Sequence, residues 1–218
     1  MLEDRILYVD AEAIVIDKPA GLPVDTPRSG GDSVAARAAE LKLGFQREPV
    51  AMHRLDRDTS GCLLLARNPK ARSKFQQSFE SGSVQKTYLA VLAGVPGGQS
   101  GVIDLPLAKF STAEEGWRMI PDEMGKRAQT NWRVLAERDG QCLVEFKPFT
   151  GRTHQIRVHA ARGLGAAIVG DPVYGGGDGP MLLHSWRIIV PRDKKPAIDV
   201  SAPVPDSFGL WLDFIDAL

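Results

Sequence analysis

Apolar residues occur along this chain in short blocks, and such blocks predict strands more often than long helices. Two runs near the start, residues 6–10 and 13–17, predict a pair of strands separated by Ala11-Glu12. The run Cys62-Leu63-Leu64-Leu65-Ala66 has no polar position and predicts a strand buried on both faces. Further strands are predicted at residues 87–92, 129–137, 141–147 and 181–190, with the last of these expected to be the final strand.

Three segments predict helices: Ser33 to Leu43, Asn68 to Gly82, and Thr153 to Arg162. The second segment has the clearest boundaries, because Asn68 is a good N-cap, proline follows at the first helical position, and Gly82 is suited to end the helix. Thr153 is the expected cap of the third segment, with Ile156 and Ala160 facing inward. Residues 96–125 are irregular and predict either a hairpin or a long loop.

This pattern of elements predicts an α+β fold. Residues 1–218 are expected to form a single domain, with a mixed, largely antiparallel sheet flanked by helices and loops. Neither a repeat nor a linker interrupts the chain, and 43% hydrophobic residues are enough for a sizeable core.

The composition of the chain indicates where in the cell the protein is expected. The apolar runs are far too short to span a membrane, and the acidic start of the chain lacks the features of a signal peptide. A soluble, cytoplasmic protein is therefore expected. Cys62 and Cys142 lie in apolar runs and are predicted to be buried thiols rather than a disulfide.

Charge is balanced overall but unevenly distributed. Lysine and arginine number 27, as do aspartate and glutamate, yet residues 47–86 hold eight basic and four acidic residues, and residues 147–162 hold four basic and no acidic ones. The first 35 residues hold seven acidic and three basic ones. The two basic segments could converge on one cleft that faces phosphates, with the acidic segment away from it, or they could be ordinary solvated surfaces.

The most informative motif is the polar segment from His53 to Gly61, which precedes the buried run. Within it Arg54 and Arg57 flank Asp56, and nearby arginines hold an aspartate in its ionised form. An ionised carboxylate in a loop can act as a nucleophile or as a base. A structural turn, with Asp56 or Asp58 bonded to nearby amides, explains the same residues equally well.

These residues resemble the HRLDxxTSG motif of the RluA family of pseudouridine synthases. Other blocks resemble the family's segments in the same order: residues 14–22 (IVIDKPAGL), 86–88 (KTY), 150–159 (TGRTHQIRVH), 170–175 (GDPVYG) and 183–185 (LHS, where the family has LHA). The resemblance covers roughly residues 6–192 and implies the catalytic fold of that family.

The resemblance also implies catalytic roles for three residues. Asp56 would be the catalytic aspartate that attacks C1′ of the ribose or C6 of the base, or assists the loss of the C2′ proton. Tyr88 would stack on the target base, although a tyrosine on a strand is more often simply packed there. Arg157 would pair with the catalytic carboxylate and project from the flank of its helix.

Four further residues are candidates for substrate binding: His53, Arg54, Arg152 and Ile156. Arg54 would fill the gap that a flipped-out uridine leaves, and Arg152 would bind a phosphate or support the fold. The resemblance implies neither a cofactor nor a metal. His154 and His159 are five residues apart and lack accompanying carboxylates, so they are expected to make hydrogen bonds that support the fold.

The partner implied by the resemblance is structured RNA, a stem-loop of ribosomal or transfer RNA. Neither a membrane nor an obligate protein partner is expected, and a monomer is predicted. The KPAGL block begins at Lys18, which leaves no room for the separate N-terminal RNA-binding domain that many relatives carry.

Two alternative functions remain. A glycoside or nucleoside hydrolase could use Asp56 as its nucleophile, but it would need a second carboxylate, and Asp58 in the same short loop is a poor candidate. An RNA-binding module without activity would be expected to lack Asp56, Tyr88 or Arg157, and all three are present.

Overall fold

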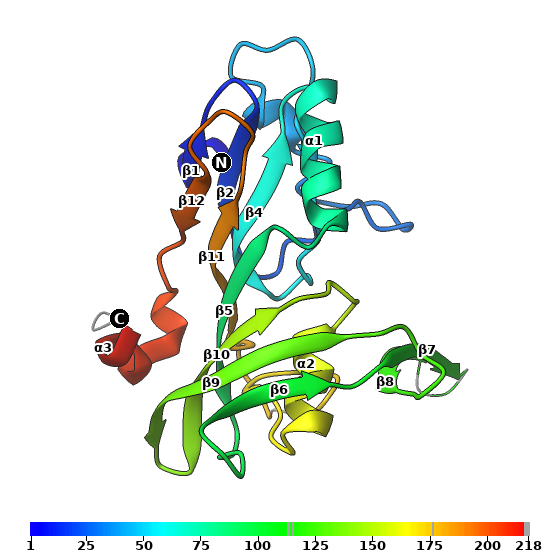
Figure 1. The fold of residues 1–218 in the computed structure, drawn as a ribbon, viewed down its shortest axis with the longest axis vertical. Helices are drawn as coiled ribbons and strands as arrows, with labels where there is room; N and C mark the ends of the chain where they lie inside the picture. Colours follow the sequence, from blue (N-terminus) through cyan, green and yellow to red (C-terminus); the bar gives the residue numbers. More distant parts are fainter. Residues whose placement is uncertain (113, 115, 176, 216–218) are drawn as a thin grey trace. The chain divides into compact units, whose positions relative to one another are not determined.

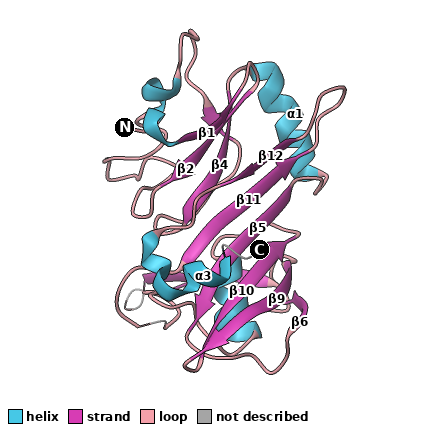
Figure 2. Cartoon of the chain, turned by 90° about the vertical axis from the view of Figure 1, so that its left-hand side faces the viewer, coloured by secondary structure: helices cyan, strands magenta, loops and turns pink. Residues whose placement is uncertain are grey.

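The computed structural model describes residues 1–112, 114, 116–175 and 177–215, which divide into two compact units. The first unit comprises residues 1–86 and 184–204, and the second comprises the described residues of 87–183 and 205–218. Strands predominate in both units (Figure 2). The chain passes between the units within strands β5 (Gln85–Leu92) and β11 (Leu183–Val190) and again after Val204, so each unit is built from separate parts of the sequence.

The sheet of the first unit has the strand order β1-β2-β4-β11 (Figure 1). Its strands are β1 (Ile6–Val9), β2 (Ala13–Lys18), β4 (Ser60–Ala66) and β11, with β3 (Val50–Ala51) paired to β4 and β12 (Ile198–Ser201) paired to β11. The pairing of β4 with β11 is parallel, and the other pairings in this unit are antiparallel. All seven residues of β4 are buried, as its continuous apolar run predicts.

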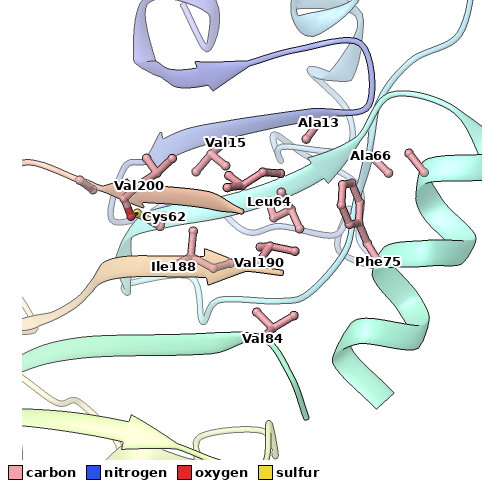
Figure 3. Packing of buried hydrophobic residues seen from close by; sticks show 13 residues of the cluster. Ala13, Val15, Cys62, Leu64, Ala66, Phe75, Val84, Ile188, Val190 and Val200 are labelled. Atoms are coloured by element: carbon pink, nitrogen blue, oxygen red, sulfur yellow. Dashed lines mark hydrogen bonds between the residues drawn. The ribbon is translucent and has the colours of Figure 1, made fainter. Parts of the chain in front are cut away.

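Helix α1 (Pro69–Glu80) covers this sheet beside β4 and contributes Ala71 and Phe75 to a core shared with the strands (Figures 1 and 3). Figure 3 shows Val15, Leu64 and Val190 packed in the same cluster. The helix begins where the sequence predicts, because the Asn68 side chain accepts a hydrogen bond of 2.9 Å from the Ala71 N–H and caps the first turn.

The second unit contains an antiparallel sheet with the order β5-β10-β9-β6 and a separate two-stranded hairpin. The strands are β6 (Ser100–Asp104), β7 (Leu107–Thr112), β8 (Gly116–Pro121), β9 (Gln129–Arg138) and β10 (Gln141–Pro148), in addition to β5. A two-residue turn joins β9 to β10, and Asp139 and Gly140 have φ values of +52° and +76°, as a type I′ turn requires.

The other helices are short. They are η1 (Glu3–Arg5) and η2 (Ala38–Leu41) in the first unit, and α2 (Gln155–Val158), the π-helical turn η3 (His159–Gly163), η4 (Asp206–Trp211) and α3 (Leu212–Ile215) in the second. No helix within the described residues is long and apolar enough to cross a bilayer. Cys62 and Cys142 are buried thiols, as predicted.

The α+β class with a largely antiparallel, mixed sheet is confirmed, and residues 96–125 contain a hairpin, β7–β8, whose residues 113 and 115 lie outside the described part of the chain. The helix predicted for residues 33–43 is wrong beyond η2. Residues 34–37 form turns, with the Arg37 N–H donating to the Ser33 carbonyl at 3.1 Å, and the 3-10 helix η2 follows, so the segment makes successive short turns and not one continuous α-helix.

Two other predictions about elements need correction. The third helix is not capped by Thr153, because the residue before α2 is His154, whose φ of +52° is left-handed. The strand at residues 181–190 is not the last, since β12 follows and pairs with it from Arg187 to Val190.

Candidate active site

The loop that contains Asp56 lies in the first unit and leads directly into β4. Its backbone turns at Asp56, whose carbonyl accepts a hydrogen bond of 3.1 Å from the Thr59 N–H. Leu55 is buried and fastens the loop to the core, whereas the neighbouring Asp56 side chain is half-buried. The apolar neighbour therefore fixes the loop while the carboxylate keeps access to solvent.

Lys18, at the end of β2, holds this loop from one side. Its ammonium is fully buried and donates to the carbonyls of Pro19, Leu22 and Arg57 at 2.8, 2.7 and 3.0 Å. The Gly21 N–H also donates to the Arg57 carbonyl, at 2.9 Å. Burial lowers the pKa of Lys18 to about 8, against the opposing influence of nearby carboxylates that include Asp58 and Asp56. The KPAGL turn is thus fastened to the residue that follows Asp56.

The other end of the loop is fixed against β11. The Ser60 hydroxyl and Nδ1 of the fully buried His184 lie 2.8 Å apart. Gly61 has a φ of +104°, and a Cβ atom at this position would lie 2.8 Å from the carbonyl carbon of Ser185. The chain can therefore pass this close to β11 only with glycine at this position.

His53 supports the loop from within the first unit. Its Nε2 accepts a hydrogen bond of 3.1 Å from the Leu64 N–H, and its ring lies 5.2 Å from the Phe79 ring. Burial and the charge of Lys86 lower the pKa of His53 to about 3, so the ring is neutral near pH 7. These contacts give His53 a structural role; its predicted contact with substrate stays a prediction.

The two arginines beside Asp56 differ in their surroundings. Arg57 donates to Asp58 at 3.0 Å, so it is paired with this carboxylate, contrary to the idea that it serves Asp56. Arg54 is exposed, and its predicted contact with RNA stays a prediction.

Arg157 lies in the second unit, on α2. Its Nε and Nη2 donate to the two carboxylate oxygens of Asp171, both at 2.7 Å, and its guanidinium lies 5.2 Å from the centre of the Tyr174 ring. All four residues of α2 are buried, so Arg157 does not project into solvent.

Asp171 is itself held firmly. Burial alone would raise the pKa of its carboxyl group, but Arg157 and the backbone N–H groups of Val173 and Tyr174 together lower it. Asp171 is thus ionised near neutral pH and fixes the plane of the guanidinium.

Other residues of the TGRTHQIRVH block support the fold of this unit. The buried Gln155 amide accepts from Thr150 and Arg152 and donates to Gln129 and Thr130. His159 Nδ1 lies 2.9 Å from the Thr130 hydroxyl and its Nε2 lies 3.1 Å from the Leu105 carbonyl, as expected for a structural histidine.

The remaining candidates also lie in the second unit. Tyr88 is on β5, opposite Phe146 of β10, and is 8% exposed. Ile156 is buried on α2 beside Arg157. Arg152 is exposed and its Nε donates to the Arg127 carbonyl at 3.0 Å, so it supports the fold and also presents charge to solvent.

The predicted residues are therefore distributed between the units. His53, Arg54 and Asp56 share one loop of the first unit, while Tyr88, Arg152, Ile156 and Arg157 belong to the second. Arg67 and Arg157 are buried, so the basic segments present less charge to solvent than their sequences suggest. Among the described residues, no group of three or more His, Cys, Asp or Glu side chains is placed to hold a metal ion.

The sequence did not assign individual roles to Lys18 and Asp171. Both lie in segments that carry the family resemblance, IVIDKPAGL and GDPVYG, and this was the signal available for them.

Comparison with known proteins agrees with the motifs. Residues 12–162 match the family described as RNA pseudouridylate synthase. The chain is 51% identical over 212 residues to an uncharacterized RNA pseudouridine synthase of Zymomonas mobilis, covering 95% of this chain and 97% of that protein. It is 34% identical over 178 residues to the ribosomal large subunit pseudouridine synthase D of the same organism, covering 78% of this chain and 56% of that protein.

The fold is similar to a solved human structure. Human RNA pseudouridylate synthase domain containing 4 superposes with a TM-score of 0.81 at 26% identity, covering 99% of this chain and 94% of that one.

Proposed function

Because the chain belongs to the RluA-type family of RNA pseudouridine synthases, which are isomerases, we propose that it converts particular uridines to pseudouridine in structured ribosomal or transfer RNA, with Asp56 as the catalytic carboxylate. The observation that carries this proposal is the fixed loop around Asp56. Lys18 and Gly21 hold the Arg57 carbonyl on one side, and Ser60 and Gly61 are fastened to β11 on the other. A catalytic group needs such support to be held in its productive position.

The reaction needs a carboxylate but no net oxidation. The bond between N1 of uracil and C1′ breaks, the uracil turns, and a bond from C5 to C1′ forms, after which C5 loses a proton and N1 carries one in the product. Asp56 can attack C1′ or C6 and later depart, or it can assist the loss of the C2′ proton. Each route leaves the atoms of the RNA in balance, and none requires a metal.

Arg157, Tyr88 and Arg54 complete the proposed machinery. Asp171 orients the Arg157 guanidinium through two hydrogen bonds, and we propose that this arginine serves the catalytic carboxylate. Tyr88 would stack on the target uracil, and Arg54, which is exposed, would take the place of the flipped nucleotide.

A relative's name points to the first RNA to test. The chain is similar to a ribosomal large subunit pseudouridine synthase, although it spans only 56% of that protein, so we propose ribosomal RNA as the first substrate and transfer RNA as the second.

The test uses purified protein and unmodified RNA transcripts. Transcripts of large-subunit ribosomal RNA and of transfer RNAs would be incubated with the protein in EDTA, and pseudouridine would be located by chemical labelling and sequencing. We expect conversion at a small number of uridines. If free uracil is released from the RNA instead, the hydrolase alternative is correct. If neither pseudouridine nor free uracil forms, in any transcript or in RNA from a strain lacking the gene, the proposal fails.

A further inference from the structure

The hairpin β7–β8 carries an exposed aromatic ring on each of its faces. Phe110 lies opposite Arg118 on one face, and Trp117 lies opposite Ser111 on the other. Their exposed fractions are 38% and 49%, which are large for aromatic residues of a small sheet. Figure 1 shows the hairpin next to the end of β6, within the second unit.

A cation lies near each ring. Lys109 Nζ is 5.5 Å from the centre of the Trp117 ring, and the Arg118 guanidinium is 5.6 Å from the centre of the Phe110 ring. An exposed ring with a cation beside it suits a nucleotide, because a base can stack on the ring while the cation attracts a phosphate.

The base of the hairpin is firmly seated in the second unit. Leu107 and Met119 pack with Val158 of α2, and the Met119 N–H donates to the Tyr174 hydroxyl at 3.0 Å. The same hydroxyl lies 2.9 Å from His154 Nδ1, and the His154 ring is 5.0 Å from the Trp117 ring. The position of Trp117 is therefore fixed by contacts that continue to Tyr174.

Tyr174 also connects the hairpin to Arg157. Its ring lies beneath the Arg157 guanidinium, and its N–H donates to the carboxylate that holds this arginine. An RNA bound to Trp117 would therefore contact a hairpin that packs on Tyr174, and Tyr174 also contacts the proposed catalytic residue Arg157.

The hairpin has no net positive charge that would attract RNA phosphates in general. Residues 107–127 contain four basic and four acidic residues, so the segment has no net charge. What it offers is aromatic surface, and binding through stacking depends little on salt compared with binding through phosphates.

We propose that β7–β8 binds unpaired nucleotides of the substrate RNA, with Trp117 as the residue on which a base stacks. This rests on the proposed function in so far as the partner is RNA. Unpaired nucleotides are specified because a base within a duplex has no free face to stack on the ring.

The experiment measures the affinity of the whole protein for an RNA stem-loop with a uridine-rich loop, and for a blunt RNA duplex of equal length, at several salt concentrations. The variants are Trp117→Ala and Trp117→Phe. Leu210→Ala is the matched control, since Leu210 is 60% exposed and lies in η4 of the same unit.

Trp117→Ala should weaken stem-loop binding by about 5- to 150-fold, the effect of one stacked base, without changing the slope of affinity against salt. Trp117→Phe should retain most of the affinity, and Leu210→Ala and duplex binding should be unchanged. Circular dichroism would verify that each variant is folded.

The proposal is overturned if Trp117→Ala binds the stem-loop as the wild type does, or if it loses duplex and stem-loop binding equally and flattens the salt slope. Pseudouridine formation is assayed separately in the same samples. A wild type that modifies RNA without dependence on Trp117 refutes only this proposal. Binding that depends on Trp117 in a protein that forms no pseudouridine refutes only the proposed function.

Discussion

At the scale of single residues, the candidate catalytic groups are held by neighbours that few patterns in the sequence reveal. Asp56 could be recognised from its motif, but the buried ammonium of Lys18 that fastens its loop could not, because a lysine on a strand is usually exposed. Similarly, Arg157 could be recognised from its block, whereas its pairing with Asp171 depends on two segments meeting in space. Motifs identify reactive groups more readily than they identify the contacts that support them.

Gly61→Ala tests the close approach of the catalytic loop to β11. An added Cβ would overlap the Ser185 carbonyl at a φ of +104°, so we expect the free energy of unfolding to fall by at least about 3 kcal/mol. Gly82→Ala is the control, because it has a φ of +71° but open space around it, and should cost only about 1 kcal/mol. Urea unfolding measures both. Equal losses of stability in the two variants would show that the close contact between Gly61 and Ser185 does not determine the cost of the substitution.

Arg157 variants test the buried pair with Asp171. Arg157→Ala leaves a buried carboxylate without its partner, so we expect a loss of about 3 to 5 kcal/mol of stability and a severe loss of turnover. Arg157→Lys keeps a charge but cannot make the two-pronged contact, and should retain more of both. Urea unfolding and single-turnover assays of folded protein provide the measurements. A lysine variant no better than the alanine variant would contradict this account.

At the scale of elements, prediction succeeded where the signals are local. Asn68, Pro69 and Gly82 bound α1 because each acts on its own turn of chain. Residues 33–43 have a helical pattern but form turns and the short 3-10 helix η2, which periodicity alone does not distinguish from an α-helix. Strand β12 has only four residues and forms because β11 is available beside it.

The start of α1 gives a prediction at this scale. Asn68→Ala removes the acceptor for the Ala71 N–H and should lower the free energy of unfolding by about 1 kcal/mol. Asn68→Asp keeps an acceptor at the same position and should retain most of the stability. Thermal and urea unfolding would show the difference; equal stability of the alanine variant and the wild type would mean that the cap contributes nothing.

At the scale of the whole molecule, the sequence predicted the α+β class correctly, because short apolar runs dominate it. The two compact units interleave along the chain at β5 and β11, and this depends on contacts between segments far apart in the sequence, which local patterns do not reveal. The balanced total charge also does not indicate which basic side chains are exposed. Some, such as Arg157, are buried in ion pairs, and those on α1 are exposed.

Two histidines with lowered pKa values predict how stability depends on pH. Burial lowers the pKa of His184 to about 4, and burial together with Lys86 lowers that of His53 to about 3, whereas an unfolded histidine has a pKa of about 6.5. Below about pH 6.5 the unfolded chain therefore binds protons that the folded chain does not, and stability falls as the pH falls towards 4. Each histidine should contribute a slope approaching about 1.4 kcal/mol per pH unit.

Urea unfolding between pH 6.5 and 5 would measure this slope before most carboxylates titrate. His184→Asn should make the slope shallower. Stability that stays constant across this interval would contradict the prediction that these rings are neutral in the folded protein.

The central claim is that Asp56 performs the chemistry of uridine isomerisation. The direct measurement is pseudouridine formation by Asp56→Asn under single-turnover conditions, in an unmodified transcript that the wild type converts. Asp58→Asn in the same loop is the comparison, after both variants are shown to be folded and to bind RNA. We expect Asp56→Asn to form no pseudouridine and Asp58→Asn, whose carboxylate pairs with Arg57, to retain activity. Conversion by Asp56→Asn at a rate near that of the wild type would contradict the account.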